Sequence, residues 1–333
     1  MSGQRKIILD TDPGVGIPGT DADDPIALLL ALSDPRLDLL AVTTTFGNCP
    51  PELGARGAGA VLAAAGRADV PVAIGDSVPL SGVLPALLVE AYAGARGRPG
   101  RVDLPMASDV VAHQSAAELI VQLVRDNPNE VTIVAIGPQT NIARALELDP
   151  EIADLLAGIV FMGGALGLDP VYGRGNITPV AECNIWFDPL AAKRVFESGI
   201  DLTMVSLDVT NPNTGLVLQD SAIRALDPTR SPVAEILAQV CTTYLDAPMF
   251  DWAPGCVLYD PLAIAVAADP GVCVTKHMSL SVETSGSLTL GQTVPIRDAK
   301  PNVRVCVDVD GARVVDELVA TILTYGDHRK DRS

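Results

Sequence analysis

The sequence has few basic residues: 23 lysines and arginines against 41 aspartates and glutamates, which gives a formal net charge of −18. Nucleic-acid binding depends on clustered Lys and Arg side chains that neutralise phosphates, and the sequence contains no such cluster. This shortage argues against a nucleic-acid partner. The charge does not exclude small neutral or cationic molecules as ligands.

Long apolar runs are also missing. The run Ile26 to Leu32 is much shorter than the roughly 20 residues that a helix needs to span a bilayer. The first residues, Met1 to Lys6, are polar and lack the apolar stretch of a signal peptide. We therefore expect a cytoplasmic protein without a membrane partner.

Cysteine and histidine occur in no pattern that is typical of a zinc or nucleophile site. The six cysteines are scattered without a CxxC pair, which argues against a zinc site and against a disulfide scaffold. The histidines His113, His277 and His328 lie far in sequence from the polar motifs below, so no Ser-His-Asp or Cys-His arrangement is indicated. We expect reduced, buried thiols and structural histidines.

What the sequence does contain is an alternation of apolar strands and helices. A strand over residues 6–10, a helix over 24–32 and a strand over 37–45 form a βαβ unit. Continuous apolar strands of this kind are typical of a parallel sheet that is covered on both faces. We expect further strands over residues 70–74, 130–136, 159–162 and 202–207.

After residue 207 the chain is predicted to be mainly helical. A small antiparallel pair is expected between residues 279–283 and 287–290, and a last helix over 311–323. The long segment 76–108, broken by a short helix, is typical of a functional lid. We expect one domain, residues 1–333, of the α/β class: an open, mostly parallel sheet flanked by helices, with a small antiparallel addition near the C-terminus.

Five carboxylates follow the first strand and precede the first helix, at Asp10, Asp12, Asp21, Asp23 and Asp24. Helix capping explains one or two aspartates at a helix start, but it does not explain five. Like charges held together repel unless something compensates, and a divalent cation is the simplest compensation. Oxygen ligands in an irregular arrangement suit Ca²⁺ better than Mg²⁺, which demands near-octahedral geometry.

Three further groups of residues carry polar or planar chemistry. The segment Asn176 to Asn184 offers two amides and a carboxylate that suit vicinal hydroxyls, although such residues are common in loops. Asp260 precedes a predicted helix, where it is either a ligand or an N-cap. The aromatic residues Tyr244, Phe250, Trp252 and Tyr259 cluster before Asp260, where they either pack or stack on a planar base.

Taken together in their order, seven blocks resemble the inosine-uridine preferring nucleoside hydrolase family. The resemblance covers about residues 6–323. The blocks are Asp10-Thr11-Asp12-Pro13-Gly14, Asp23-Asp24, Ala41 to Thr44 with Gly47-Asn48, Thr140 to Ala143, Phe161 to Gly164, Ala181 to Asn184, and Asp260-Pro261.

This resemblance implies a Ca²⁺-dependent enzyme that hydrolyses the N-glycosidic bond of ribonucleosides. It implies that the ion is held by the carboxylates of Asp12, Asp24 and Asp260 and by the backbone carbonyl of Ile136. Asp12 would be the general base, and Asp10 would orient the loop. A homo-oligomer, either a dimer or a tetramer, is also implied.

The same resemblance implies how a nucleoside would be bound. The ribose hydroxyls would contact Asp23, Asn48 and Asn184, and the 5′-hydroxyl would contact Asn176 and Glu182. Met162 would pack under the sugar. Trp252 and Tyr259 are the candidates for stacking on the base.

The chain departs from the family pattern in two places. The family has one residue between the Pro-Gly turn and the Asp-Asp pair, whereas residues 15–22 intervene here and add Asp21. Pyrimidine-tolerant relatives often carry His before the last calcium ligand, whereas this chain has Tyr259. Because an aromatic ring there can stack on a purine, we expect a preference for purine nucleosides.

Two alternatives differ in class. An apolar strand followed by Asp-x-Asp also resembles the entry to haloacid-dehalogenase-type phosphatases, in which Asp10 would be the nucleophile and Asp12 the acid/base. That scheme gives no role to Asp260 or to the segment 176–184. The other alternative is a non-catalytic protein that binds ribose or a nucleoside and has lost turnover through the insertion.

Overall fold

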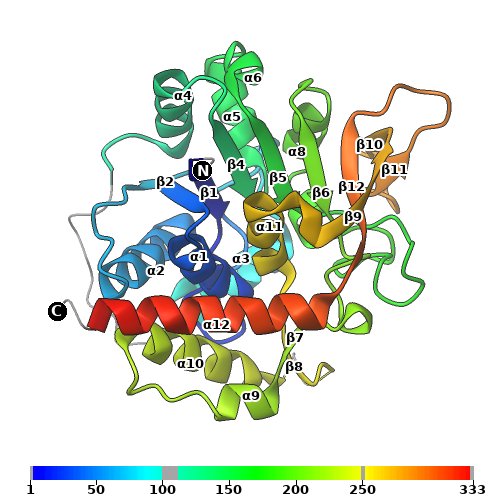
Figure 1. Cartoon of the computed structure of the whole chain (residues 1–333). Helices are drawn as coiled ribbons and strands as arrows, with labels where there is room; N and C mark the ends of the chain where they lie inside the picture. Colours follow the sequence, from blue (N-terminus) through cyan, green and yellow to red (C-terminus); the bar gives the residue numbers. More distant parts are fainter. Residues whose placement is uncertain (1–2, 100–111, 249–251, 331–333) are drawn as a thin grey trace.

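An eight-stranded sheet forms the centre of the protein in the computed structural model, which describes residues 3–99, 112–248 and 252–330 (Figure 1). Neighbouring strands are parallel except at one edge, where the last two are antiparallel. The order across the sheet is β3 (Val72–Ile74), β2 (Leu37–Thr44), β1 (Arg5–Thr11), β4 (Val131–Ala135), β5 (Gly158–Met162), β6 (Leu202–Val205), β12 (Val303–Val309) and β9 (Cys273–Met278).

The central strands are apolar along their length because both faces of the sheet are covered. In β1, Ile7 and Leu9 belong to one buried apolar cluster and Ile8 belongs to another, as expected when successive side chains point to opposite faces. All three side chains are fully buried. The prediction of a mostly parallel, doubly covered sheet is confirmed.

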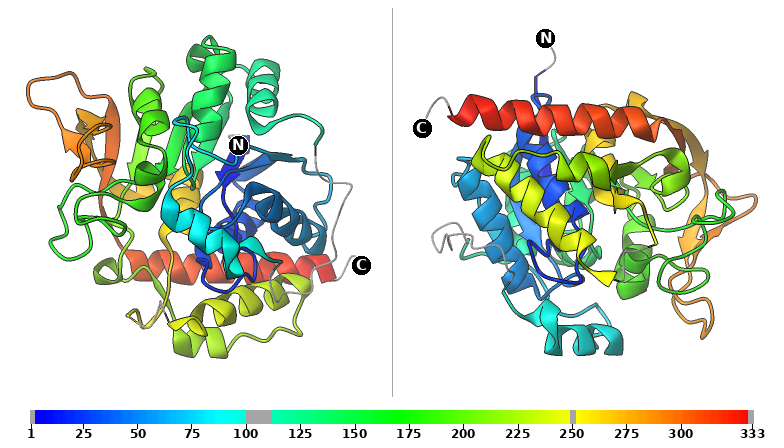
Figure 2. Two further views of the ribbon diagram at one scale, coloured as in Figure 1. Left: turned by 180° about the vertical axis from the view of Figure 1, so that it is seen from behind. Right: turned by 90° about the horizontal axis from the view of Figure 1, so that it is seen from below.

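Helices cover the two faces. The cluster that contains Ile7 includes side chains of α1 (Asp23–Ser33), α2 (Pro51–Ala64), α10 (Pro232–Leu245), α11 (Tyr259–Ala268) and α12 (Gly311–Lys330), and α12 lies beside α10 (Figure 2). The opposite cluster includes side chains of α4 (Ala116–Asp126), α5 (Thr140–Leu148), α6 (Ile152–Leu155), α7 (Cys183–Phe187) and α8 (Pro189–Phe196). The remaining described elements are α3 (Ala86–Ala93), α9 (Asp220–Arg224), β7 (Val217–Gln219), β8 (Gly255–Val257), β10 (Leu280–Val282), β11 (Thr293–Pro295) and the 3-10 turns η1 (Ala95–Gly97), η2 (Pro212–Thr214) and η4 (Pro270–Val272).

Several predicted boundaries are wrong. The strand β10 pairs with β11 and not with residues 287–290, which form part of a turn that closes through Gly291 at φ 77°. The last helix continues to Lys330, beyond its predicted end at residue 323. The pair β7–β8 was not predicted, because each strand has only three residues and Gly255 lets the chains approach closely. The predicted loop 76–108 is described only to residue 99, and Phe250 lies outside the described residues.

The parallel strands place their C-terminal ends at one edge of the sheet. Ligands bind at this edge in open parallel sheets, outside the carboxyl ends of the strands. The chain leaves β1 at Thr11, β4 at Ala135 and β5 at Met162, so the motifs that follow these strands meet there. Among the described helices, none is long and apolar enough to cross a membrane.

Candidate active site

A cavity at the C-terminal edge of the sheet brings together residues from six separate stretches of the chain. Its wall contains every predicted site residue except Trp252. Two residues that were not assigned to the site, Asp21 and Cys183, also line it. The lining residues are Asp12, Asp21, Asp23, Asp24, Asn48, Ile136, Met162, Asn176, Glu182, Cys183, Asn184, Tyr259 and Asp260.

The aspartates at the two helix starts do not act as helix caps. In α1 the N-cap residue is Ala22, which makes no side-chain capping bond, and Asp23 and Asp24 are the first two helical residues. In α11 the N-cap residue is Leu258, also without a side-chain bond, and Asp260 lies within the first turn. The capping alternative therefore does not account for these carboxylates. The helix N-termini still favour negative charge at this point.

Three of these carboxylates form a compact group. Asp23, Asp24 and Asp260 each place an oxygen within 4.8 Å of the others, and all three side chains are buried. The backbone N–H of Asp260 donates to Asp23 Oδ2 at 3.3 Å, while Asp23 Oδ1 is buried without a hydrogen-bond partner among the described residues. An orphaned carboxylate oxygen beside two further carboxylates fits a hard cation.

The three carboxylates of this group repel one another. Burial raises the pKa of Asp23 and Asp260 well above the ordinary value, and the neighbouring carboxylates raise it further. Within the described residues, the trio that could hold an ion contains Asp23, whereas the sequence resemblance implied Asp12 in that place. Asp12 lies in the same cavity wall, outside the trio.

Asp12 is fixed by the turn that follows β2. Its Oδ2 accepts the backbone N–H of Asn48 at 2.6 Å, and Asn48 Nδ2 donates to Asp24 Oδ2 at 2.8 Å. At Gly47, a Cβ atom would lie 1.9 Å from Asp12 Oδ2, so only glycine allows the turn to approach this closely. Burial, and then the charge of Asp24, raise the pKa of Asp12.

Asp10 is separate from the cavity. It is fully buried at the end of β1, where its Oδ1 accepts Thr43 Oγ1 at 2.5 Å and Asn141 Nδ2 at 2.8 Å. Burial raises its pKa to about 6. A buried carboxylate outside the cavity wall is not an accessible nucleophile, which argues against the phosphatase alternative and agrees with a supporting role.

The insertion at residues 15–22 is a compact, packed loop. Val15 and Ile17 are buried, and Thr20 Oγ1 lies 2.7 Å from the carbonyl oxygens of Gly14 and Ile17. The loop thus returns the chain to its starting point, and the Asp12 N–H donates to Asp24 Oδ1 at 3.1 Å. The extra residues do not separate the two carboxylates.

The segment 176–184 has largely structural hydrogen bonds. Glu182 Oε1 accepts the N–H of Asn184, and its Oε2 accepts the N–H groups of Gly164 and Ile185, so it caps α7. Asn184 Nδ2 donates to the carbonyl oxygen of Ile136 at 3.1 Å. Asn176 Oδ1 accepts the N–H of Cys183 at 2.9 Å. These bonds hold the segment against the ends of β4 and β5.

The two aromatic candidates lie in different places. Tyr259 lines the cavity at the start of α11. Trp252 has half of its side chain exposed, packs against Tyr172 with ring centroids 5.9 Å apart, and is not among the lining residues. The role predicted for Trp252 stays a prediction.

Comparisons with known proteins agree on one family. The family model described as inosine-uridine preferring nucleoside hydrolase matches residues 7–316. The pyrimidine-specific ribonucleoside hydrolase RihA of Shigella boydii is 38% identical over 325 residues, which cover 96% of this chain and 98% of RihA. Among solved structures, a purine-preferring ribonucleoside hydrolase from Gardnerella vaginalis has a TM-score of 0.84 at 32% identity, covering 97% of this chain and 99% of its own. A plant nucleoside hydrolase has a TM-score of 0.81 at 30% identity, with coverages of 96% and 99%.

Proposed function

The chain belongs to the inosine-uridine preferring nucleoside hydrolase family and is thus a hydrolase that acts on the N-glycosidic bond of ribonucleosides; we propose that it does so with Ca²⁺ as cofactor and Asp12 as general base. The observation that carries this proposal is the buried carboxylate trio beside Asp12, in which one oxygen of Asp23 has no partner among the described residues.

The residues present fit a hard cation. Asp12, Asp24 and Asp260 would hold it together with the carbonyl oxygen of Ile136, all of which line the cavity. The Asp23 carboxylate would interact with both the ion and the sugar, as its place in the trio suggests. When bound, the ion would lower the pKa of a water molecule and offset the negative charge of the site.

In the proposed reaction, one carboxylate accepts a proton from water, and the others stabilise the positive charge that develops on the sugar. Asp12 would take a proton from the water whose oxygen bonds to C1′ of the ribose. The bond from C1′ to the base nitrogen breaks, and its electron pair leaves with the base, which takes up a proton from bulk water, while Asp12 later returns its proton to bulk water. Positive charge builds on the ribose ring in this step, and fixed carboxylates nearby stabilise it.

The sugar would be oriented by the cavity wall. Asp23, Asn48 and Asn184 are proposed to contact the 2′- and 3′-hydroxyls, and Asn176 and Glu182 the 5′-hydroxyl. Met162 is proposed to lie under the ring. The hydrogen bonds that already fix Asn48 and Glu182 would keep these contacts in one geometry, so little ordering is needed when the substrate binds.

Purine nucleosides are the proposed preferred substrates because Tyr259 contributes an aromatic ring to the cavity. The name of the Shigella boydii relative favours pyrimidine nucleosides instead, whereas the Gardnerella vaginalis structure is of a purine-preferring enzyme. A purine preference and a pyrimidine preference differ in which base is released faster.

A panel of purine and pyrimidine nucleosides, with and without a chelator, tests the proposal by base release. We expect release that the chelator stops and added Ca²⁺ restores, with higher kcat/KM for purines. Release that persists after complete metal removal would refute the cofactor, and faster pyrimidine release would refute the preference. Calorimetric binding of ribose or a nucleoside without any base release would identify a binding protein instead.

A further inference from the structure

A segment that follows β3 runs beside the cavity without lining it. Residues 75–97, here called the β3–α4 arm, include the short helix α3 and the turn η1. None of the arm's residues is among those that line the cavity. Its contacts nevertheless reach the turn after β2, which bonds to Asp12 and Asp24, and the inserted loop, which carries Asp21.

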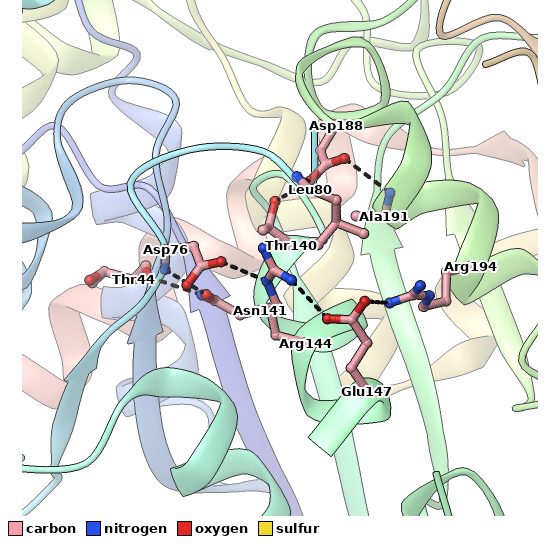
Figure 3. Close-up of polar contacts among 10 residues, drawn as sticks. All are labelled: Thr44, Asp76, Leu80, Thr140, Asn141, Arg144, Glu147, Asp188, Ala191 and Arg194. Carbon is pink, nitrogen blue, oxygen red and sulfur yellow. Dashed lines mark hydrogen bonds and ion pairs between the residues drawn. The ribbon is translucent and has the colours of Figure 1, made fainter. Parts of the chain in front are cut away.

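The start of the arm is anchored to α5 and to the loop before α8 (Figure 3). The N–H of Asp76 donates to Asn141 Oδ1 at 3.2 Å, and Arg144 Nε donates to Asp76 Oδ2 at 2.8 Å. The N–H of Leu80 donates to Asp188 Oδ2 at 2.8 Å. Arg144 also contacts Glu147, which pairs with Arg194, so the anchor is a connected network rather than a single bond.

The helix of the arm has its own apolar contact with the site loops. Leu88 is fully buried in a small cluster with Phe46 and Phe187. Phe46 directly precedes the turn that holds Asp12, and Tyr92 packs against the same cluster. The position of α3 is therefore fixed by the apolar contacts of Leu88 and Tyr92.

The phenol of Tyr92 is bonded to the backbone of the turn after β2. Its oxygen accepts the N–H of Gly47 at 2.8 Å and lies 3.1 Å from the carbonyl oxygens of Gly47 and Cys49, to which its O–H donates. Burial raises the pKa of the phenol, so it stays protonated. One side chain thus spans the turn on both sides of Asn48.

Asn48 is bonded to three of the aspartates in the cavity wall. Its N–H holds Asp12, its Nδ2 holds Asp24, and its Oδ1 accepts the N–H of Asp21 at 3.3 Å. A displacement of this turn would therefore move three carboxylate residues together. Because Gly47 packs against Asp12 without room for a Cβ atom, a small shift in the turn is felt at that carboxylate.

The arm holds the inserted loop by a second contact. Arg96 Nε donates to the carbonyl oxygen of Gly19 at 2.7 Å. Burial raises the pKa of Asp21 to about 6, and the charge of Arg96 acts in the opposite direction. The insertion is thus bonded to the arm through Gly19 and to Asn48 through Asp21.

We infer that Tyr92 is a positioning residue, which holds the Gly47–Cys49 turn so that Asn48 keeps Asp12 and Asp24 in their working geometry. The inference concerns the site of the proposed function and rests on it for its kinetic consequence. Tyr92 is not among the residues that line the cavity. It acts through the backbone of the turn.

The test is Tyr92→Phe, which removes the hydroxyl and keeps the ring in its apolar cluster. The matched control is Tyr325→Phe, because the Tyr325 hydroxyl also donates to a backbone carbonyl, that of Ala65, remote from the cavity. We expect kcat to fall about tenfold in Tyr92→Phe with KM changed less than threefold, since removing an indirect support of ligating or catalytic groups costs about 10–100-fold. The control should keep both constants.

Amide hydrogen exchange of residues 46–50 gives a readout that needs neither metal nor substrate. In Tyr92→Phe the amides of Gly47 and Asn48 should exchange faster than in the wild type and in the control. Unchanged exchange and unchanged kcat would overturn the inference. Faster exchange with unchanged kcat would overturn the positioning role. If the wild type releases no base at all, the proposed function fails, and the inference is then judged by exchange and by calorimetric Ca²⁺ affinity, which must fall in Tyr92→Phe.

Discussion

Replacing Asp23 by Asn removes one charge from the carboxylate trio with little change in shape. We predict that this substitution stabilises the protein in chelator and loses that advantage in Ca²⁺. The reason is that the same carboxylate repels Asp24 and Asp260 when no cation is present and becomes useful when one is bound.

The magnitude follows from the spacing of the trio. Two unit charges 4.8 Å apart interact by about 3.5 kcal/mol at an effective dielectric constant of about 20. Burial and repulsion raise the pKa of Asp23, and partial protonation relieves much of this energy. We therefore expect a gain of about 1–2 kcal/mol in the free energy of unfolding, or about 1–3 °C in Tm, for Asp23→Asn in chelator at pH 7.5.

Ca²⁺ should remove the difference in stability between Asp23→Asn and the wild type. At a concentration of about 100 times its Kd, a ligand that binds only the folded state adds about 2.7 kcal/mol to the stability. If loss of the Asp23 charge weakens Ca²⁺ binding about tenfold, the same Ca²⁺ concentration adds only about 1.4 kcal/mol to the variant. The advantage of the variant in chelator should then disappear.

The assay is thermal unfolding of wild type and Asp23→Asn in excess chelator and in saturating Ca²⁺. Asp316→Asn is the control, because Asp316 is an exposed carboxylate on α12, remote from the cavity. It should behave as the wild type in both conditions. A variant that is less stable than the wild type by the same amount in chelator and in Ca²⁺ would refute the view that these three carboxylates repel and share a cation.

Three further predictions concern separate features. Asp12→Ala should lower ribose release by about 10²–10⁴-fold while far-UV circular dichroism stays unchanged, because it removes the proposed base; near-normal turnover would disprove that assignment. Tyr259→Ala should raise KM for purine nucleosides about tenfold and for pyrimidine nucleosides less, in steady-state base-release kinetics; equal changes would argue against stacking. Ser115→Ala should lower the free energy of unfolding in urea by about 1 kcal/mol without changing kcat, because it breaks the capping box with Glu118 at the start of α4; an unchanged midpoint would mean that the box contributes nothing.

Much of the acidic site was predictable because it follows from local sequence. Asp10 and Asp12 come at the end of an apolar strand, and Asp23 and Asp24 at the start of an apolar helix, so the C-terminal edge of a parallel sheet collects them. The helical period and apolar strands likewise predicted the covered sheet. These features depend on residues close together in the chain, which a sequence displays directly.

The roles of Tyr92 and Arg96 were not predictable in this way. They lie 45 and 77 residues from the glycines that they contact, in a segment for which the sequence predicted only a long loop broken by a short helix. The failed prediction of residues 287–290 as a strand has a similar cause, since a three-residue strand is chosen by its partner and by the glycine turn before it.

Local patterns in the sequence thus predict which residues carry charge and which edge of the sheet they reach, because strand and helix periodicity are local properties. The grouping of the carboxylates depends instead on how distant segments pack. In the folded chain Asp23 joins Asp24 and Asp260 in the trio, and the N–H of Asn48 holds Asp12 beside them. The inserted loop ends close to where it begins, so that the N–H of Asp12 bonds to Asp24. Burial and distances of a few ångströms between remote segments set these relations, and they follow from packing of the whole chain.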